Sequence, residues 1–167
     1  MKQRYLILFS LSGLILALDQ LLKHVVQSSW QQGTEHWLIP GFISAILKQN
    51  NGFAFGLLQQ APKQFQEIFF IAVPIFALVL IILIFIKLQD DQMLTSVALT
   101  TIFSGAMGNL LDRIKYSYVI DFLQIHWKEK IILPAFNIAD ISILVGVILM
   151  FLNTLKQNGR GRREKGI

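Results

Sequence analysis

Apolar residues in this chain form long runs instead of alternating with polar ones. Residues 68–86 and 92–111 contain no charged side chain. Each run can cross a hydrocarbon core about 30 Å thick, which takes about 20 residues in a helix. Residues 5–18 and 141–155 are shorter, and each reaches a full span only by including an aspartate. The pattern predicts four transmembrane helices, at about residues 5–22, 66–87, 92–113 and 136–155.

The segments between these helices differ in length and character. Residues 28–65 and 114–133 mix β-forming residues with turn residues, and Asn51-Gly52 is a good tight-turn signal. Loops this long usually carry function or structure of their own. We therefore expect one polytopic membrane domain over residues 1–167: an all-α integral membrane protein with four transmembrane helices and a small β-rich extracytoplasmic element.

Composition and charge agree with a membrane location. The chain is 54% hydrophobic and 15% charged, whereas soluble domains carry about 25% charged residues. Much of the net charge of +5 lies in the basic tail at residues 156–167, so it does not call for a nucleic-acid partner. Basic residues close to a span favour the cytoplasmic side. Lysine and arginine are almost equally divided between the two faces, so the prediction that both termini are cytoplasmic rests on their clustering at the termini.

The first apolar segment could instead be a cleaved signal peptide, because Lys2 and Arg4 precede it. The residues Leu16-Ala-Leu-Asp-Gln form a poor cleavage site, however, so an uncleaved helix is favoured. The chain has no cysteine. Disulfides, thiolate metal sites and cysteine nucleophiles are therefore excluded.

Polar residues gather at one predicted membrane face. Asp140 is the only charged residue between Ile131 and Leu155, and a charge at the bilayer centre costs roughly 3 kcal/mol. Because spans alternate in direction, the ends of helices 1 and 3 and the starts of helices 2 and 4 share a face. The polar residues at or near this face are Asp19, Lys23, Asn50, Asn109, Asp112, Arg113, Asp121, Asn137 and Asp140.

Each group has a functional and an ordinary interpretation. Asp121 and Asp140, if they converge, could share one proton and activate a water; Asp140 could also simply face water at a helix start. Asp19 and Lys23 lie four residues apart on one helix face. They could be an anchoring pair in which Lys23 reaches the headgroups, or Asp19 and Gln20 could brace the outer loop or orient substrate. The group Asn109, Asp112 and Arg113 also shares one face, as a support for the site or as an ordinary helix end with a local ion pair.

Other kinds of chemistry have little support in the sequence. The three histidines show no metal-ligand spacing, and neither H-E-x-x-H nor G-x-S-x-G occurs. We expect no metal and no cofactor. A proton-coupled transporter would use intramembrane Asp and Lys, but the polar residues form no path across the membrane. A lipid-headgroup phosphotransferase that binds Mg²⁺ through its aspartates is a further alternative. The histidines are His24, His36 and His126.

Five blocks of the sequence, in order, resemble the bacterial lipoprotein signal peptidase (signal peptidase II) family. The blocks cover most of the chain, and together they are highly specific. They are Asp19-Gln20-x-x-Lys23, Asn50-x-Gly52-x-Ala54-Phe55-Gly56, Gly105-x-x-Gly108-Asn109-x-x-Asp112-Arg113, Val119-Ile120-Asp121-Phe122 and Pro134-x-Phe136-Asn137-x-Ala139-Asp140.

The resemblance implies an aspartyl endopeptidase of the bacterial inner (plasma) membrane. The family removes signal peptides from prolipoproteins by cutting just before a cysteine that carries diacylglyceryl. Asp121 and Asp140 match its catalytic pair. The other matched positions, expected to bind substrate or support the site, are Asp19, Lys23, Asn50, Gly52, Asn109, Asp112, Arg113, Asn137 and Ala139. The expected partners are the prolipoprotein and membrane lipids, with the chain itself a monomer.

Two residues depart from the family pattern. Ser104 precedes Gly105 where a second glycine is frequent, and Ser117 stands where a glycine is common. Neither touches the proposed chemistry. They concern local helix packing and the loop before Asp121.

Overall fold

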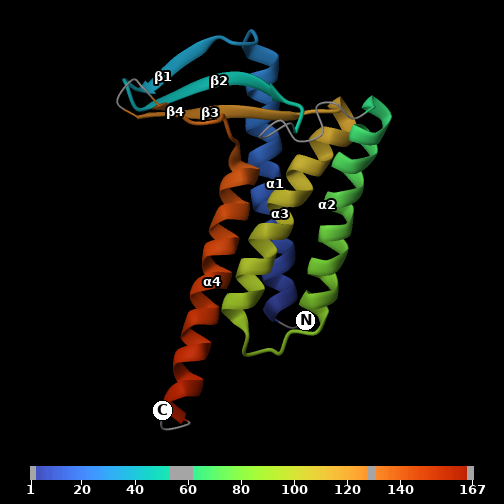
Figure 1. Cartoon of the computed structure of the whole chain (residues 1–167), viewed down its shortest axis with the longest axis vertical. Coiled ribbons are helices and arrows are strands. Elements are labelled where there is room, and N and C mark those ends of the chain that lie inside the picture. Colours follow the sequence, from blue (N-terminus) through green and yellow to red (C-terminus); the bar gives the residue numbers. More distant parts are fainter. Residues whose placement is uncertain (1–2, 53–61, 128–130, 165–167) are drawn as a thin grey trace.

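The computed structural model describes residues 3–52, 62–127 and 131–164, with side chains described as far as Gln157. Four helices run alongside one another, a sheet lies across one end, and both termini lie towards the other end (Figure 1). The helices are α1 (Gln3–Ser29), α2 (Lys63–Ile86), α3 (Met93–Tyr116) and α4 (Ile138–Glu164). The strands are β1 (Glu35–Ile39), β2 (Ile43–Asn50), β3 (Val119–Trp127) and β4 (Ile131–Ile132).

All four helices are long and apolar enough to cross a membrane, and α3 lies at their centre. Of its most apolar stretch, 56% is buried inside the protein, against 11% for α1, 11% for α2 and 17% for α4. It packs against each of the other three helices, most extensively against α4. This position explains why the membrane-spanning stretch of α3 is the least apolar of the four: its polar side chains face neighbouring helices and not lipid.

The β-rich element predicted from the sequence is an antiparallel sheet with the strand order β1-β2-β3-β4. In the central pair, Asn50 lies opposite Val119, Lys48 opposite Asp121 and Ile43 opposite Ile125. One end of the sheet therefore carries Asn50 and Asp121. The turn after β2 is stabilised by the side chain of Asn50, which accepts a hydrogen bond from the Gly52 amide at 2.9 Å. Gly52 has φ +83°, which glycine adopts without strain.

Helix α1 continues to Ser29, about two turns beyond the predicted end near residue 22. The added turns pack on the sheet: Val26 joins a buried cluster with Leu47 of β2 and with Ile120 and Phe122 of β3. Burial of this apolar face stabilises the extra turns, since most helical stability in proteins comes from packing and not from propensity.

Other helix ends also differ from the sequence expectation. Helix α3 runs three residues further, to Tyr116, and ends at Ser117, which adopts the left-handed conformation with φ 65°. Glycine is the usual residue at such a helix end, which accounts for the glycine common at this position in the family pattern. Helix α4 begins at Ile138 and continues to Glu164, so much of the basic segment expected as a tail is helical. Residues 165–167 and the motif positions Ala54, Phe55 and Gly56 lie outside the described residues.

Glycines let α3 and α4 approach closely, as the run Ser104-Gly-Ala-Met-Gly predicted. A Cβ atom on Gly105 would lie 2.2 Å from the carbonyl oxygen of Ala139 and 2.4 Å from Ser142 Oγ. Ser104 is fully buried, and its hydroxyl donates to the Thr100 carbonyl at 2.6 Å within the same helix. A serine is therefore accommodated beside Gly105 without an unpaired hydroxyl.

Substituting Gly105 with alanine is expected to lower the free energy of unfolding by about 1–3 kcal/mol, because the backbone of α4 must move. The measurement is thermal unfolding of the purified protein in detergent. Gly13→Ala is the matched control: Gly13 is also helical, and a Cβ there meets no atom within 4 Å. The control should unfold at or slightly above the native temperature. Equal unfolding temperatures for the two variants would contradict the close contact.

Candidate active site

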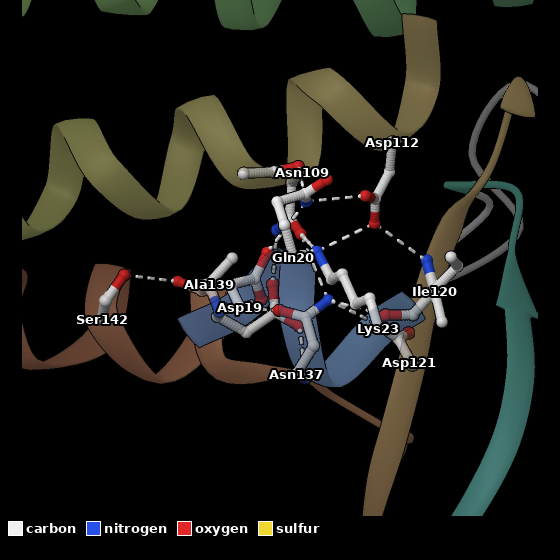
Figure 2. A network of polar contacts seen from close by, with 12 residues as sticks. Asp19, Gln20, Lys23, Asn109, Asp112, Ile120, Asp121, Asn137, Ala139 and Ser142 are labelled. Carbon is white, nitrogen blue, oxygen red and sulfur yellow. Dashed lines mark hydrogen bonds and ion pairs between the residues drawn. The ribbon is translucent and has the colours of Figure 1, made fainter. Parts of the chain in front are cut away.

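Ten of the eleven predicted site residues lie where the sheet meets the helices, and these ten form one group connected by hydrogen bonds and ion pairs. Asp19 and Lys23 come from α1, Asn109 and Asp112 from the end of α3, and Asp121 from β3. Asn50 ends β2 and is followed by Gly52, while Asn137, Ala139 and Asp140 form the start of α4. Figure 2 shows the side chains of Asp19, Lys23, Asn109, Asp112 and Asn137 pointing towards one another. Arg113, the eleventh, is described separately below.

Asp140 caps the helix on which it lies. Its Oδ2 accepts a hydrogen bond from the Asn137 amide at 3.1 Å, and its own amide donates to Asn137 Oδ1 at 2.9 Å. This reciprocal pair has the form of a capping box. The helix start favours a negative charge at Asp140. Asp140 is half-buried, so it remains within reach of a bound molecule.

Asp121 is held by two asparagines at the end of the sheet. Asn50 Nδ2 donates to Asp121 Oδ2 at 2.9 Å, and Asn137 Nδ2 donates to Oδ1 at 2.8 Å. Asp121 is 1% exposed. Burial is the largest of the effects that raise the pKa of Asp121 to about 7; the charge of Asp140 also raises it, while the two amide hydrogen bonds and Lys23 lower it. The Asp121 carboxyl therefore carries a proton in part of the molecules near neutral pH.

Two asparagines connect the two candidate acids. Asn109 Nδ2 donates to Asp140 Oδ1 at 2.7 Å. The same Asn137 amide that binds Asp121 also donates to Asn109 Oδ1 at 3.1 Å and to the Ile120 carbonyl at 3.2 Å. Asn137 is fully buried. The chain thus brings a strand carboxyl and a helix carboxyl together through one rigid amide bridge.

Lys23 lies beneath this bridge as a buried cation. Its Nζ is 2.8 Å from Asp19 Oδ2, 2.8 Å from Asp112 Oδ2 and 3.1 Å from Asn109 Oδ1. Lys23 is 1% exposed, so the alternative in which it reaches the lipid headgroups is wrong. The i,i+4 pair predicted from the sequence is present, and it forms part of a larger ion network.

Each aspartate of this network also fixes a backbone segment near the candidate acids. Asp19 Oδ1 accepts the amide of Ala139 at 2.9 Å, next to Asp140. Asp112 Oδ2 accepts the amide of Ile120 at 3.1 Å, next to Asp121. The network therefore sets the relative positions of α4 and β3. It also decides between two alternatives: Asp112 pairs with Lys23 of α1, as a support for the site would, so an ordinary helix end with only a local ion pair is excluded.

Small residues allow this close arrangement. Ala139 is fully buried, and a Cβ on Gly108 would lie 2.8 Å from Asp19 Oδ2 and 3.3 Å from the Ala139 methyl group. On the other side of the site, the ring of Phe70 in α2 lies against Gly52, where a Cβ would be 2.7 Å from the ring. Larger side chains at these glycines would separate the segments that carry the candidate acids.

Arg113 lies beside the network and is one of the residues that line a cavity of about 330 Å³. Its guanidinium carbon is 6.0 Å from the centre of the Phe70 ring, and its charge interacts with Asp112, Asp121 and Asp140. The cavity opens between α2 and the end of α3, and its lining includes Asn51, Lys63, Glu67, Phe70 and Ser117. A cationic, partly aromatic cavity beside two carboxyls can hold a peptide backbone or an anionic group.

Two groups that contribute to the site could not be predicted from the residue types in the sequence. The amide of Ile120 and the ring of Phe70 act through position, and no sequence signal marks them. Gln20 carried a signal, since it is next to Asp19 within the first block. Its Nε2 donates to Asp112 Oδ1 at 3.0 Å and to the Gly108 carbonyl at 3.3 Å, so it braces α1 against α3.

The sequence and fold of this chain are similar to those of known proteins. A family model described as signal peptidase (SPase) II matches residues 11–156. The chain belongs to the signal peptidase II family. Membership makes it a peptidase and, with its four apolar helices, a multi-pass membrane protein. The resemblance drawn from the five sequence blocks is thereby confirmed.

Relatives of this family match the chain over almost its whole length. The lipoprotein signal peptidase of Geobacter metallireducens is 38% identical over 164 residues, which cover 98% of this chain and 99% of the relative. That of Geobacter sulfurreducens is 41% identical and covers 87% and 89%. A solved structure titled as a bacterial membrane enzyme has a TM-score of 0.81 at 29% identity, and covers 96% of this chain and 92% of its own. The predicted fold class is confirmed.

Proposed function

We propose that this protein is an aspartyl endopeptidase that removes signal peptides from prolipoproteins, cutting just before a cysteine that carries diacylglyceryl, with Asp121 and Asp140 as its catalytic pair. The observation that carries the proposal is the amide bridge through Asn137 and Asn109, which holds one carboxyl from β3 and one from α4 together. The relatives named lipoprotein signal peptidase support the substrate class.

The mechanism follows from the protonation of the pair. Two carboxyls at close range do not both ionise readily, so one keeps its proton. The raised pKa of Asp121 makes it the proton carrier, which leaves Asp140 as the general base. Asp140 takes a proton from a water, the water attacks the scissile carbonyl, and Asp121 donates to the developing oxyanion. When the tetrahedral intermediate breaks down, the C–N bond is cleaved, the proton on Asp140 passes to the leaving amine, and Asp121 takes back its proton as the new carboxyl group forms.

The remaining site residues position these groups. Asn50, Asn109 and Asn137 each use an amide to hold a carboxyl oxygen at 2.7–2.9 Å, so their geometry survives the change in charge. Arg113, at the cavity beside the pair, is suited to bind a backbone carbonyl or carboxylate of the substrate. We infer that the 330 Å³ cavity receives the peptide on one side of the scissile bond.

The site lies at one end of the membrane helices, so the orientation of the protein decides on which side of the membrane the site lies. We propose that the protein acts in the bacterial inner membrane as a monomer, with both termini in the cytoplasm and the sheet on the extracytoplasmic side. The basic cluster after residue 155 supports this orientation. A prolipoprotein anchored by its signal peptide would then present its cleavage site at the level of the candidate acids, with membrane lipids around both.

The proposal is tested by incubating the purified protein in detergent with a diacylglyceryl-modified prolipoprotein in the presence of EDTA. We expect cleavage just before the modified cysteine, and no cleavage of the same precursor without the lipid. A lipid phosphotransferase that uses Mg²⁺ would be inactive under these conditions. If a folded sample leaves the modified precursor intact while a known family member cleaves it, the proposed function is wrong.

Activity is expected to fall as the pH rises above about 7. The active pair carries one proton, and raising the pH through the pKa of Asp121, about 7, removes it. The fall in kcat/KM, which reports the pKa values of the free enzyme, should approach roughly tenfold per pH unit, as for loss of one essential proton. The measurement is kcat/KM between pH 6 and 9, with return to pH 6.5 to show that the loss is reversible. Constant or rising activity over this range would exclude Asp121 as the proton carrier.

A further inference from the structure

The cavity of about 330 Å³ beside the candidate acids is lined by two charged side chains that have no ion-pair partner. It lies between the start of α2 and the end of α3, next to one end of the sheet (Figure 1). Lys63 and Glu67 of α2 line it, and both are exposed. In the part of the chain that the structure describes, neither side chain forms an ion pair. Arg113, which also lines the cavity, has its charge close to three acids of the site. Two charges therefore remain available to a bound molecule.

The position of Glu67 suits a cavity that receives polar groups. Glu67 lies one turn along α2, and the residues that follow it, 68–86, contain no charged side chain. A charge beside hydrocarbon is costly, so an exposed charge at the start of a membrane helix requires polar surroundings. Asn51, Gln66 and Ser117 supply further polar groups to the same lining. The cavity is therefore unsuited to an apolar occupant.

The cavity favours a negatively charged group close to Lys63. Lys63 is the first residue of α2, and the start of a helix carries a partial positive charge. Pro62 precedes the helix, and no side chain among the described residues caps it, so its first amides have no partner within the helix. Glu67 lies on the same helix face as Lys63, about 6 Å further along the axis. Glu67 therefore opposes the preference that Lys63 creates.

The chemistry of the proposed substrate indicates which part of it fits this cavity. A signal peptide has an apolar central region, and such a segment would leave Lys63 and Glu67 without polar partners. The chain that follows the modified cysteine leaves the membrane for water. Asn51 follows β2 and Ser117 precedes β3, so the cavity reaches the level at which the sheet lies. The segment after the cysteine is therefore the part that matches both the polarity and the position of the cavity.

We propose that this cavity binds the first residues of the mature lipoprotein, those that follow the modified cysteine, and that Lys63 and Glu67 select among substrates by charge, with acidic residues favoured. The inference rests on the proposed function and names the part of the substrate that the cavity receives. Lys63 and the start of α2 attract an acidic side chain, and Glu67 weakens this attraction. Neither residue belongs to the five sequence blocks, so the selection comes from positions outside the family pattern.

The test measures kcat/KM for three diacylglyceryl-modified precursors that differ only in the two residues after the modified cysteine, which are both Glu, both Gln or both Lys. Four proteins are compared: the native chain, Lys63→Gln, Glu67→Gln and Lys87→Gln. Lys87 is the matched control, because it is an exposed lysine at the other end of α2. The quantity compared is the ratio of kcat/KM for the Glu precursor to that for the Lys precursor, which does not depend on how much of each variant folds.

We expect the native chain to cleave the Glu precursor faster than the Lys precursor. Lys63→Gln should lower the ratio about two- to fivefold, and Glu67→Gln should raise it by a similar factor, which is the range for exposed charge pairs. Both shifts should shrink at high salt, because salt screens exposed charges. Lys87→Gln should leave the ratio at its native value.

A native preference for the Lys precursor, or a ratio that Lys63→Gln or Glu67→Gln leaves unchanged, would overturn the inference. Sensitivity to charge that appears only when the charged residues are moved to the positions just before the modified cysteine would overturn it as well. The Gln precursor separates this inference from the proposed function. If the native chain cleaves that precursor and the ratios do not change, only the charge selection is wrong; if it cleaves none of the three precursors, both are wrong.

Discussion

Replacing Asp121 or Asp140 with asparagine is expected to lower kcat for prolipoprotein cleavage roughly 10²- to 10⁴-fold, the range typical of a lost general acid or base. Asparagine at position 140 cannot take a proton from water, and asparagine at position 121 cannot hold the shared proton. Both carboxyls accept amide hydrogen bonds, so each variant also places a new NH₂ group near existing donors. The measurement is cleavage of the diacylglyceryl-modified precursor under single-turnover conditions.

Asp91→Asn is the matched control, because Asp91 is an exposed acid in the turn between α2 and α3, at the other end of the helices. It should cleave at the native rate. Thermal unfolding of all three variants separates lost chemistry from lost folding: the Asp121 and Asp140 variants should remain folded at the assay temperature. Near-native cleavage by either of these variants would exclude the proposed pair.

Substituting Lys23 with methionine is expected to lower the free energy of unfolding by about 3–5 kcal/mol, as removal of one partner from a buried ion pair does. The change leaves Asp19 and Asp112 without their cation, and these residues are 0% and 1% exposed. For a chain of this size the unfolding temperature should fall by roughly 10 °C. The measurement is thermal unfolding in detergent at pH 7.

Lys87→Met provides the control for the loss of a lysine as such, since Lys87 is exposed at the end of α2. It should change the unfolding temperature by less than about 2 °C, because surface substitutions have small effects. The same small effect for Lys23→Met would mean that the buried network does not stabilise the fold. Because Asp19 binds the Ala139 amide beside Asp140, any Lys23→Met protein that folds should also cleave more slowly.

The helices were predictable because lipid imposes a simple rule on them: a long uncharged run must form a helix. Their ends were not, because contacts with other parts of the chain determine them. The last turns of α1 depend on Val26 packing against β2 and β3. The end of α3 depends on Ser117 adopting a left-handed conformation. Hydropathy carries neither kind of information.

The sequence predicted which residues form the site better than it predicted which of them bind one another. The free-energy cost of placing a charge in the membrane indicated Asp140 as a candidate site residue, and the five sequence blocks indicated the other residues. The partners of each residue depend on how helices rotate against one another. Thus Asp112 forms an ion pair with Lys23 of another helix, although Arg113 is its neighbour in sequence. The bridge from Asn137 to Asp121 depends on the register of β3, which the sequence does not specify.

The position of Asn137 and Asp140 so late in the chain has a consequence for biosynthesis. When the ribosome has completed α1, α2 and α3, Asp19 has no Ala139 amide to bind and Asn109 has no Asp140 carboxyl. Polar groups left unpaired within a membrane are costly. A three-helix chain is therefore expected to be poorly packed, and it lacks Asp140, one of the two proposed catalytic acids. Synthesis of the last helix completes the buried polar network.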